Sequence, residues 1–181
     1  MAEAFSNKLT RAAGIVTTSS SGAVGITSTI ITGISTVGVA VSDLVDNTNF
    51  IAGTKVTVYG DAADLVVVDR ASTNTAVASA QIFNFLAITR AYTSAAATKS
   101  ILIGGTFANN TANSVNLTVE IHDASAGIQA ALASKIPVTT GSSFVISEAG
   151  KTILEATDEV RVFCDTANAI DVNLSILTGV S

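Results

Sequence analysis

The C-terminal half of the sequence alternates between apolar and polar residues. In residues 115–122, valine, leucine or isoleucine occupies every second position and polar residues lie between them. Residues 160–165 and 170–176 show the same period of two. This period puts the apolar side chains on one face of a β-strand, so each segment predicts a half-buried strand. Turn-forming residues separate these segments at intervals of about 8 to 12 residues, which is typical of an antiparallel sandwich or barrel.

One segment of this half also suits a helix. Residues 125–135 contain four alanines, which favour a helix. The segment is short, however, it lies between two predicted strands, and Pro137 would limit a helix at its C-terminal end. We predict a strand here, with a helix as the alternative.

The N-terminal half contains shorter β-branched or aromatic runs, joined by glycine and asparagine turns. The predicted strands are residues 26–31, 37–41, 55–59, 64–69 and 81–88. We predict that they form a separate small β subdomain, entered through a hinge at residues 19–22. The predicted fold is therefore all-β: an antiparallel β-sandwich or jelly-roll-like module with a second small β subdomain inserted near the N-terminus.

The composition narrows the class of protein. Hydrophobic residues make up 48% of the 181 residues and charged residues only 13%, with a net charge of −5. High hydrophobicity argues against disorder, and the abundance of β-branched residues argues against a coiled coil. The single cysteine cannot form an internal disulfide scaffold. Nine lysines and arginines against a negative net charge argue against a nucleic-acid partner.

Residues 12–42 carry no charge and raise the question of a membrane span. Glycine, serine and threonine interrupt this stretch, whereas a spanning helix needs about 20 predominantly apolar residues. We therefore expect strands and no membrane association. The first residues include Glu3 and no apolar stretch, so we expect no secretory signal and synthesis in the cytoplasm.

Five segments of the C-terminal half combine turn residues with strands in a familiar order. They are Ser100-Ile-Leu-Ile-Gly-Gly-Thr-Phe-Ala-Asn-Asn-Thr, Val119-Glu-Ile-His-Asp-Ala-Ser-Ala-Gly, Ile136-Pro-Val-Thr-Thr-Gly-Ser-Ser-Phe, Ile153-Leu-Glu-Ala-Thr-Asp-Glu-Val-Arg-Val and Asp165-Thr-Ala-Asn-Ala-Ile-Asp-Val-Asn-Leu-Ser-Ile-Leu. With these segments, residues 97–181 resemble a small β-sandwich module common among virion structural proteins of tailed bacteriophages, marine cyanophages especially.

In that family a lysine-containing first strand leads directly into a Tyr-Thr-x-Pro-Ala turn. Here the corresponding segments, Ala4-Phe-Ser-Asn-Lys-Leu-Thr and Ala91-Tyr-Thr-Ser-Ala-Ala, lie about 80 residues apart. The resemblance therefore implies an insertion. We assign residues 1–18 with 89–181 to the sandwich module, whose first strand spans about residues 5–17, and residues 19–88 to the inserted subdomain.

The insert has a resemblance of its own. Val41-Ser-Asp-Leu-Val-Asp, Phe50-Ile-Ala-Gly-Thr-Lys-Val-Thr and Ser72-Thr-Asn-Thr-Ala are similar to a short β module that recurs in phage tail, fibre and other surface proteins. The sequence departs from that module at Ile51, where a proline is common. Both resemblances rest on turn residues and alternation, which specify a fold and not a reaction.

The residues capable of catalysis are few and dispersed. The only histidine, His122, precedes Asp123, but neighbouring strand residues point to opposite faces, so a solvated turn position fits better than a base and its orienting carboxylate. Cys164 falls on the apolar side of its strand, where a free cysteine packs as a small hydrophobe. Asp158 and Glu159 fit a solvated turn, in which Asp158 can hydrogen-bond its own backbone.

The densest group of oxygen-bearing side chains lies in residues 43–49, with Asp43, Asp46, Asn47 and Asn49. Calcium takes six to eight oxygen ligands, but this loop lacks the EF-hand order of acids, glycine and terminal glutamate. A plain turn is favoured, and a bound cation is the alternative. We predict no catalytic site, no cofactor and no metal.

The resemblance and the composition together predict a non-enzymatic structural protein of a tailed-phage virion, assembled in many copies against other virion proteins. We expect an accessory position on the particle surface, as capsid decoration or a neck or tail attachment. Candidate contact residues are Phe50, Ile51, Phe83 and Phe85, each of which fits a core position equally well. The alternative function is a secreted adhesin or carbohydrate-binding β-sandwich, against which the missing signal and the presence of only two tyrosines argue.

Overall fold

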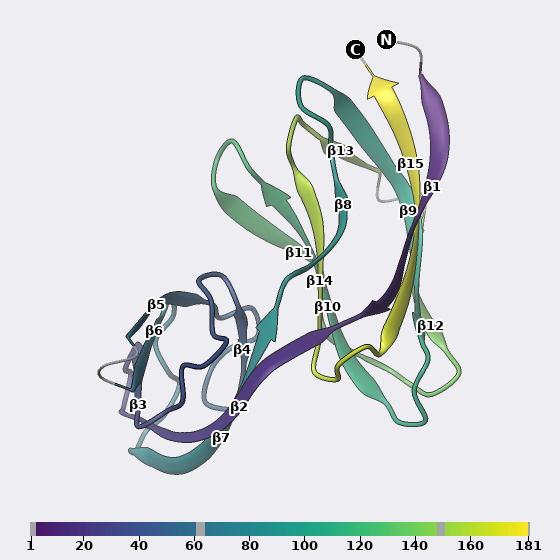
Figure 1. Cartoon of the computed structure of the whole chain (residues 1–181). Helices are drawn as coiled ribbons and strands as arrows, with labels where there is room; N and C mark the ends of the chain where they lie inside the picture. Colours follow the sequence, from purple (N-terminus) through teal and green to yellow (C-terminus); the bar gives the residue numbers. More distant parts are fainter. Residues whose placement is uncertain (1–2, 61–63, 148–150, 181) are drawn as a thin grey trace. The chain divides into compact units, whose positions relative to one another are not determined.

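The computed structural model describes residues 3–60, 64–147 and 151–180. Within these ranges the regular structure consists of strands alone, and every pairing between named strands is antiparallel (Figure 1). The predicted all-β, antiparallel, sandwich-like fold is confirmed. A search of the same residues for a helix long and apolar enough to cross a membrane finds none.

The chain divides into two compact units. Unit 1 combines Met1–Gly14 with Thr89–Ser181, and unit 2 is Ile15–Ile88. Unit 2 therefore interrupts unit 1 in the sequence, and the chain passes between the units twice.

Unit 1 contains two sheets. Sheet 1 has the order β1-β15-β9-β12, with β13 also paired to β9, and sheet 2 has the order β11-β10-β14-β8. The strands of sheet 1 are β1 (Ala4–Ala13), β9 (Lys99–Asn109), β12 (Ser143–Ile146), β13 (Thr152–Leu154) and β15 (Ile170–Val180). Those of sheet 2 are β8 (Thr89–Thr93), β10 (Val115–Asp123), β11 (Ile128–Val138) and β14 (Glu159–Cys164).

The inner faces of the two sheets form one aliphatic core. Leu102 and Leu174 of sheet 1 belong to the same buried cluster as Leu117 and Val162 of sheet 2. Their spacing follows the alternation in the sequence, because every second residue of a strand points to the same face. This packing is that of a β-sandwich.

The outer face of sheet 2 differs from the prediction. We expected β10 and β14 to be half-buried, with solvated polar residues on the outward side. Instead Thr118, Glu120 and Arg161 are buried, and Phe163 is completely buried. Both strands are therefore covered on both faces.

Residues 125–135, for which a helix was the alternative, contribute to a strand. They lead into and form most of β11, so the predicted strand is confirmed. Pro137 lies near the end of β11, opposite Asn116. Since β11 is at the end of the strand order of sheet 2, a residue without an N–H is tolerated there.

Unit 2 is built around sheet 3, whose order is β4-β7-β2-β3-β6-β5. Its strands are β2 (Ile15–Val24), β3 (Ile30–Thr32), β4 (Leu44–Asp46), β5 (Val56–Gly60), β6 (Leu65–Val68) and β7 (Ala78–Ala87). A separate buried cluster includes Ile31, Val66, Phe83 and Phe85. Unit 2 thus has its own hydrophobic core.

Of the strands predicted for the insert, one is absent from the structure and another is shorter than predicted. Residues 37–41 form no strand, because Gly38 has a φ of 79° and the Val39 N–H donates to the Thr36 carbonyl in a turn. Of the strand predicted at residues 26–31, only the last two residues are included in β3. The other three predicted strands correspond to β5, β6 and β7, whose bounds lie within a few residues of the prediction.

The first strand also ends earlier than predicted. A break at Gly14 separates β1 from β2, and Gly14 has a φ of 113°, a region that favours glycine. A Cβ at Gly14 would lie 2.5 Å from the Thr166 carbonyl oxygen, so the backbone also needs glycine for space. Residues 15–17 therefore belong to unit 2, and the hinge predicted at residues 19–22 is wrong, because these residues pair with β7 inside β2.

Candidate functional site

The outer face of sheet 1 carries exposed apolar side chains in a continuous row. Phe5 lies opposite Leu177, Leu177 opposite Ile101, and Ile101 opposite Ile153. Directly opposed residues of antiparallel strands share a face and contact each other, so the row crosses β1, β15, β9 and β13 (Figure 1). Phe5 is 76% exposed and Ile153 63% exposed.

A second row runs across the same face. Leu9 lies opposite Asn173, Asn173 opposite Thr106, and Thr106 opposite Val145. Leu9 is 73% exposed and Val145 57% exposed. Between the two rows, Asn7 lies opposite Ser175, which lies opposite Gly104. We name the following positions the outer face of sheet 1: Phe5, Asn7, Leu9, Ile101, Gly104, Thr106, Val145, Ile153, Asn173, Ser175 and Leu177. These positions are uncharged, and the charged Arg11 and Asp171 lie next to them, lining one hollow with Leu9 and Asn173.

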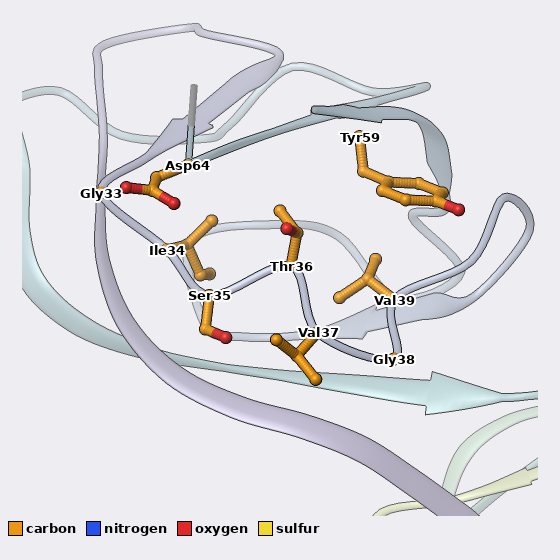
Figure 2. A pocket seen from close by; sticks show the side chains of 9 residues that line it. All are labelled: Gly33, Ile34, Ser35, Thr36, Val37, Gly38, Val39, Tyr59 and Asp64. Atoms are coloured by element: carbon orange, nitrogen blue, oxygen red, sulfur yellow. The ribbon is translucent and has the colours of Figure 1, made fainter. Parts of the chain in front are cut away.

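Unit 2 contains an open hollow of about 840 Å³. The segment of residues 33–39 lines it together with Tyr59 and Asp64, and Figure 2 shows that segment running beneath them, with Asp64 near one end and Tyr59 near the other. The segment is held by its backbone: the Ile34 N–H donates to the Asp64 carbonyl and the Ser35 N–H donates to Ser20 Oγ. The hollow therefore combines a half-exposed aromatic ring with a carboxylate and hydroxyl groups.

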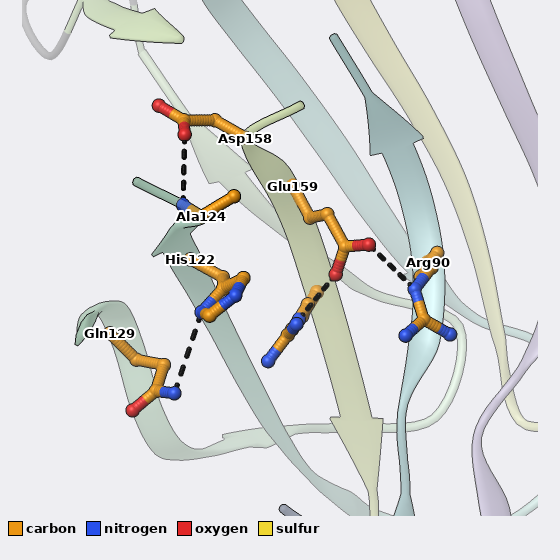
Figure 3. Close-up of polar contacts among 7 residues, drawn as sticks. Arg90, His122, Ala124, Gln129, Asp158 and Glu159 are labelled. Atoms are coloured by element: carbon orange, nitrogen blue, oxygen red, sulfur yellow. Dashed lines mark hydrogen bonds and ion pairs between the residues drawn. The ribbon is translucent and has the colours of Figure 1, made fainter. Parts of the chain in front are cut away.

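Sheet 2 carries an ion-pair cluster on its outward side. Glu159 accepts hydrogen bonds from the Arg90 side chain at 2.7 Å and from the Arg161 side chain at 2.6 Å (Figure 3). Burial opposes ionisation of the Glu159 carboxyl, but the hydrogen bonds from the two arginines outweigh burial and lower the pKa of Glu159. The cluster fixes side chains across β8 and β14 and leaves both carboxylate oxygens occupied.

The structure does not pair the His122 ring with the Asp123 carboxylate. The nearest polar contact of the ring is a long one, 3.4 Å from His122 Nδ1 to Gln129 Nε2. Asp123 instead accepts the N–H groups of Ser125 and Ala126 within its own turn, and these bonds lower the pKa of Asp123, the one from Ala126 most. The carboxylate beside His122 is thus engaged in a turn and does not orient the ring.

The position of Asp158 differs in part from the predicted solvated turn. Its carboxylate accepts the Glu155 N–H at 2.8 Å, as expected of a turn residue, and also the Ala124 N–H at 3.0 Å from another loop (Figure 3). The residue is buried and not solvated, because its oxygens tie two loops together. Glu159 is not a turn residue either, since it begins β14.

Cys164 lies in the core of unit 1, with no exposed surface. Burial raises the pKa of the thiol to about 11. Because the thiolate is the nucleophile, a buried thiol with a raised pKa is inert at neutral pH. The predicted buried position of Cys164 is confirmed.

The oxygen-rich loop at residues 43–49 uses its side chains internally. Asp43 is buried, and its carboxylate accepts the Ala40 N–H at 2.9 Å. Burial raises the pKa of Asp43 even though this hydrogen bond and one from Thr17 lower it. Asn47 Oδ1 accepts the Asn49 N–H at 2.8 Å. In the described part of the chain, no group of three or more histidine, cysteine, aspartate or glutamate residues could hold a metal ion.

The candidate contact residues of the insert divide between core and surface. Phe50, Phe83 and Phe85 are buried in the core of unit 2, where Phe50 and Phe83 stack at a ring distance of 6.3 Å. Their side chains are therefore unavailable to a partner, and the prediction that these three residues are contact residues is wrong. Ile51 is 51% exposed and keeps an accessible side chain.

The sequence analysis missed the outer face of sheet 1. Phe5 and Leu9 lie four residues apart in the first strand, on one face, but β1 alone gives no sign that this face lacks a covering layer. The hollow was missed as well, since Tyr59 and Asp64 converge on residues 33–39 only through the pairing of β5 with β6 and the loop contacts.

Comparison of the chain with protein-family models, with curated proteins and with solved structures found no match.

Proposed function

We propose that this chain is a non-enzymatic structural component of a tailed-bacteriophage virion. It acts as an accessory surface protein, in capsid decoration or neck or tail attachment, and assembles in many copies against capsid, neck or tail proteins. The observation that carries the proposal is the outer face of sheet 1, whose centre is uncharged and on which Phe5, Leu9, Val145 and Ile153 are exposed. Exposed apolar surface of this kind marks protein interaction sites on soluble proteins.

Two further features support a role in assembly. The uncharged centre of this face can be covered by a neighbour at low cost in desolvation, because no ion there must be stripped of water. The segments that resemble phage virion modules form β9, β10 and β14, which carry the core of unit 1. The exposed face supports assembly against another protein, and the resemblance alone supplies the virion context of the proposal.

Purified particles of the phage that encodes the chain test this proposal. We expect quantitative mass spectrometry to find the chain in a fixed, stoichiometric number of copies per particle. A density map of the intact particle then shows the sandwich on its surface. Absence of the chain from washed particles, or a trace amount that varies between preparations, would overturn the proposal.

A second candidate function rests on the hollow in unit 2. An exposed tyrosine ring can stack on the apolar face of a sugar, and the Asp64 carboxylate can accept hydrogen bonds from its hydroxyls. This arrangement favours the carbohydrate-binding alternative. Its volume of about 840 Å³ falls within the range of small-molecule sites.

Saturation-transfer NMR with a panel of methyl glycosides tests the second candidate. We expect signals with the wild-type chain that disappear in Tyr59→Ala and in Asp64→Asn, an exchange that tolerates the positive φ of residue 64. Tyr92→Phe, a change in unit 1, is the matched control and should retain the signals. Equal signals in all four proteins, or none in the wild type, would rule the hollow out as a sugar site.

A further inference from the structure

We propose that the outer face of sheet 1 binds the same face of a second copy of this chain, forming a two-fold symmetric sandwich of two sheets. The inference rests on the proposed function, in which the chain assembles in many copies, and it names the occupant of the exposed face.

The face carries both a protrusion and a hollow. Phe5 protrudes, with 76% of its surface exposed. A hollow of about 310 Å³ lies beside Leu9, and its lining includes Thr106, Ala108 and Asn173 together with the charged Arg11 and Asp171. It is large enough to accept a phenylalanine side chain.

The positions of the protrusion and the hollow suit a two-fold axis. Phe5 and Leu9 are four residues apart on β1, which corresponds to about 13 Å along a strand. An axis lying in the interface, across the strands and above Asn7, places the Phe5 side chain of each copy over Leu9 of the other, at the border of the hollow. Such an isologous contact is self-complementary and closes at two copies.

Charged residues lie at both ends of the face, and at one end Arg11 and Asp171 also line the hollow beside Leu9. At the Phe5 end, Lys99 pairs with Glu155 at 3.1 Å. At the opposite end, Arg11 lies close enough to contribute to the lowered pKa of Asp171, where the Ala12 N–H bond has the largest effect. An uncharged centre with a charged rim is the usual anatomy of a protein interface. The same two-fold axis brings the two ends together, so each end meets both a cation and an anion.

The face has the size that a stable contact requires. β1, β9 and β15 contribute ten or eleven residues each, and the short β12 and β13 together form the fourth row. At about 3.4 Å per residue and about 4.8 Å between strands, the whole sheet spans about 640 Å². Standard protein interfaces bury about 800 Å² on each partner, and crystal-packing contacts bury less than about half of that. Face-to-face packing of two sheets about 10 Å apart is also a common arrangement within proteins.

Sedimentation velocity of the full chain, over a concentration range from micromolar to several hundred micromolar, tests the inference. We expect a reversible dimer for the wild type and a dissociation constant raised about 100-fold or more in Phe5→Asp, because each copy loses its aromatic anchor and buries a carboxylate instead. Ile128→Asp is the matched control: Ile128 is 63% exposed on β11 of sheet 2 and should leave the dimer unchanged. Far-UV circular dichroism of each variant establishes that it is folded.

Cross-linking tests the position of the axis. Cys164 is buried, so a cysteine introduced at Asn7 is the accessible thiol of the Asn7→Cys chain. A short bismaleimide should join two Asn7→Cys chains and leave Ile128→Cys chains unjoined. Equal cross-linking of both variants would overturn the face-to-face arrangement.

The outcomes separate this inference from the proposed function. A wild-type chain that stays monomeric over the whole range but is stoichiometric in particles overturns the second copy as occupant and keeps the virion role. A dimer that depends on Phe5, with no chain in particles, supports the inference and overturns the virion role. A monomeric wild type whose Phe5→Asp variant fails to enter particles assigns the face to a different virion protein and overturns the inference.

Discussion

The two sheets of unit 1 share one core but differ on their outer faces. The outward side of sheet 2 carries Glu120 and Arg161, yet both residues are buried. The outward side of sheet 1 carries Phe5 and Ile153, yet both are exposed. The polarity of the outward positions therefore does not tell which face is covered within the chain. In sheet 2 the covered ions are matched by partners, whereas in sheet 1 the exposed apolar rows have none among the described residues of unit 1.

The largest expected effect comes from the buried ions of sheet 2. Arg161→Leu leaves the Glu159 carboxylate with the exposed Arg90 as its remaining partner, so the loss should approach about 3–5 kcal/mol, the cost of a fully uncompensated buried charge. Arg90→Leu is the matched control: the Arg90 side chain is 55% exposed, so its loss should cost about 1 kcal/mol or less. Urea unfolding of the two variants measures both values. Equal losses would mean that the depth of burial does not distinguish the two arginines.

The next effect separates the two faces of sheet 1. Leu174→Ala removes a fully buried side chain from the inner face and should lower the free energy of unfolding by about 2–5 kcal/mol. Leu9→Ala removes the same atoms from the outer face, where the side chain is 73% exposed, and should change it by about 0.5 kcal/mol or less. Urea unfolding at low micromolar concentration, where self-association is minimal, measures both. A cost for Leu9→Ala as large as for Leu174→Ala would show that the outer face is covered within the chain.

A pH dependence follows from Glu159. The pKa of Glu159 is lowered from its ordinary 4.5 in the folded chain, so the unfolded chain binds more protons in the interval between the two values. The stability that Glu159 contributes is therefore present above pH 4.5 and is lost as the pH falls through the folded pKa. Glu159→Gln should lower stability at pH 7 and flatten its decline below pH 4.5. Thermal unfolding of the two proteins between pH 3 and pH 7 measures the difference, and parallel curves would contradict the assignment.

The smallest effect is expected from removing unit 2. Deletion of Ile15–Ile88, with a short Gly-Ser linker between Gly14 and Thr89, keeps both sheets of unit 1 and its core. We expect cooperative unfolding of the shortened chain, with stability changed by about 1 kcal/mol, because a flexible loop costs little to close. Circular dichroism and limited proteolysis measure the result. An unfolded product would show that unit 1 does not fold alone.

The alternation along the chain was sufficient to predict β10, β14 and β15. Their inner faces follow the period of two, and the strand at residues 125–135 follows from the position of Pro137 and the neighbouring strands. The break at Gly14 was not predictable, because it depends on the Thr166 carbonyl oxygen, which is far away in the sequence. The strand expected at residues 37–41 failed because a turn at Gly38 overrode the β-branched residues on either side.

The candidate site was less predictable than the fold. Burial of Cys164 followed from its position in an alternating strand. For Phe83 and Phe85 the sequence fitted core and surface equally well, and the structure shows that both are buried on β7. Coverage of a face depends on which sheet packs against it, and the period of two carries no information on that. For this reason the exposed rows at Phe5 and Leu9 emerged only from the structure.

The junction between the units has a consequence for how such a chain can change. The Gly14 N–H donates to Thr89 Oγ1 at 3.2 Å, so the residue before the insert and the residue after it are neighbours in unit 1. Any polypeptide whose own termini lie close together can occupy that gap without altering the register of β1 or β8. Unit 1 can therefore accept other domains at this point. Recombination can replace the inserted domain while the sequence of unit 1 stays constant.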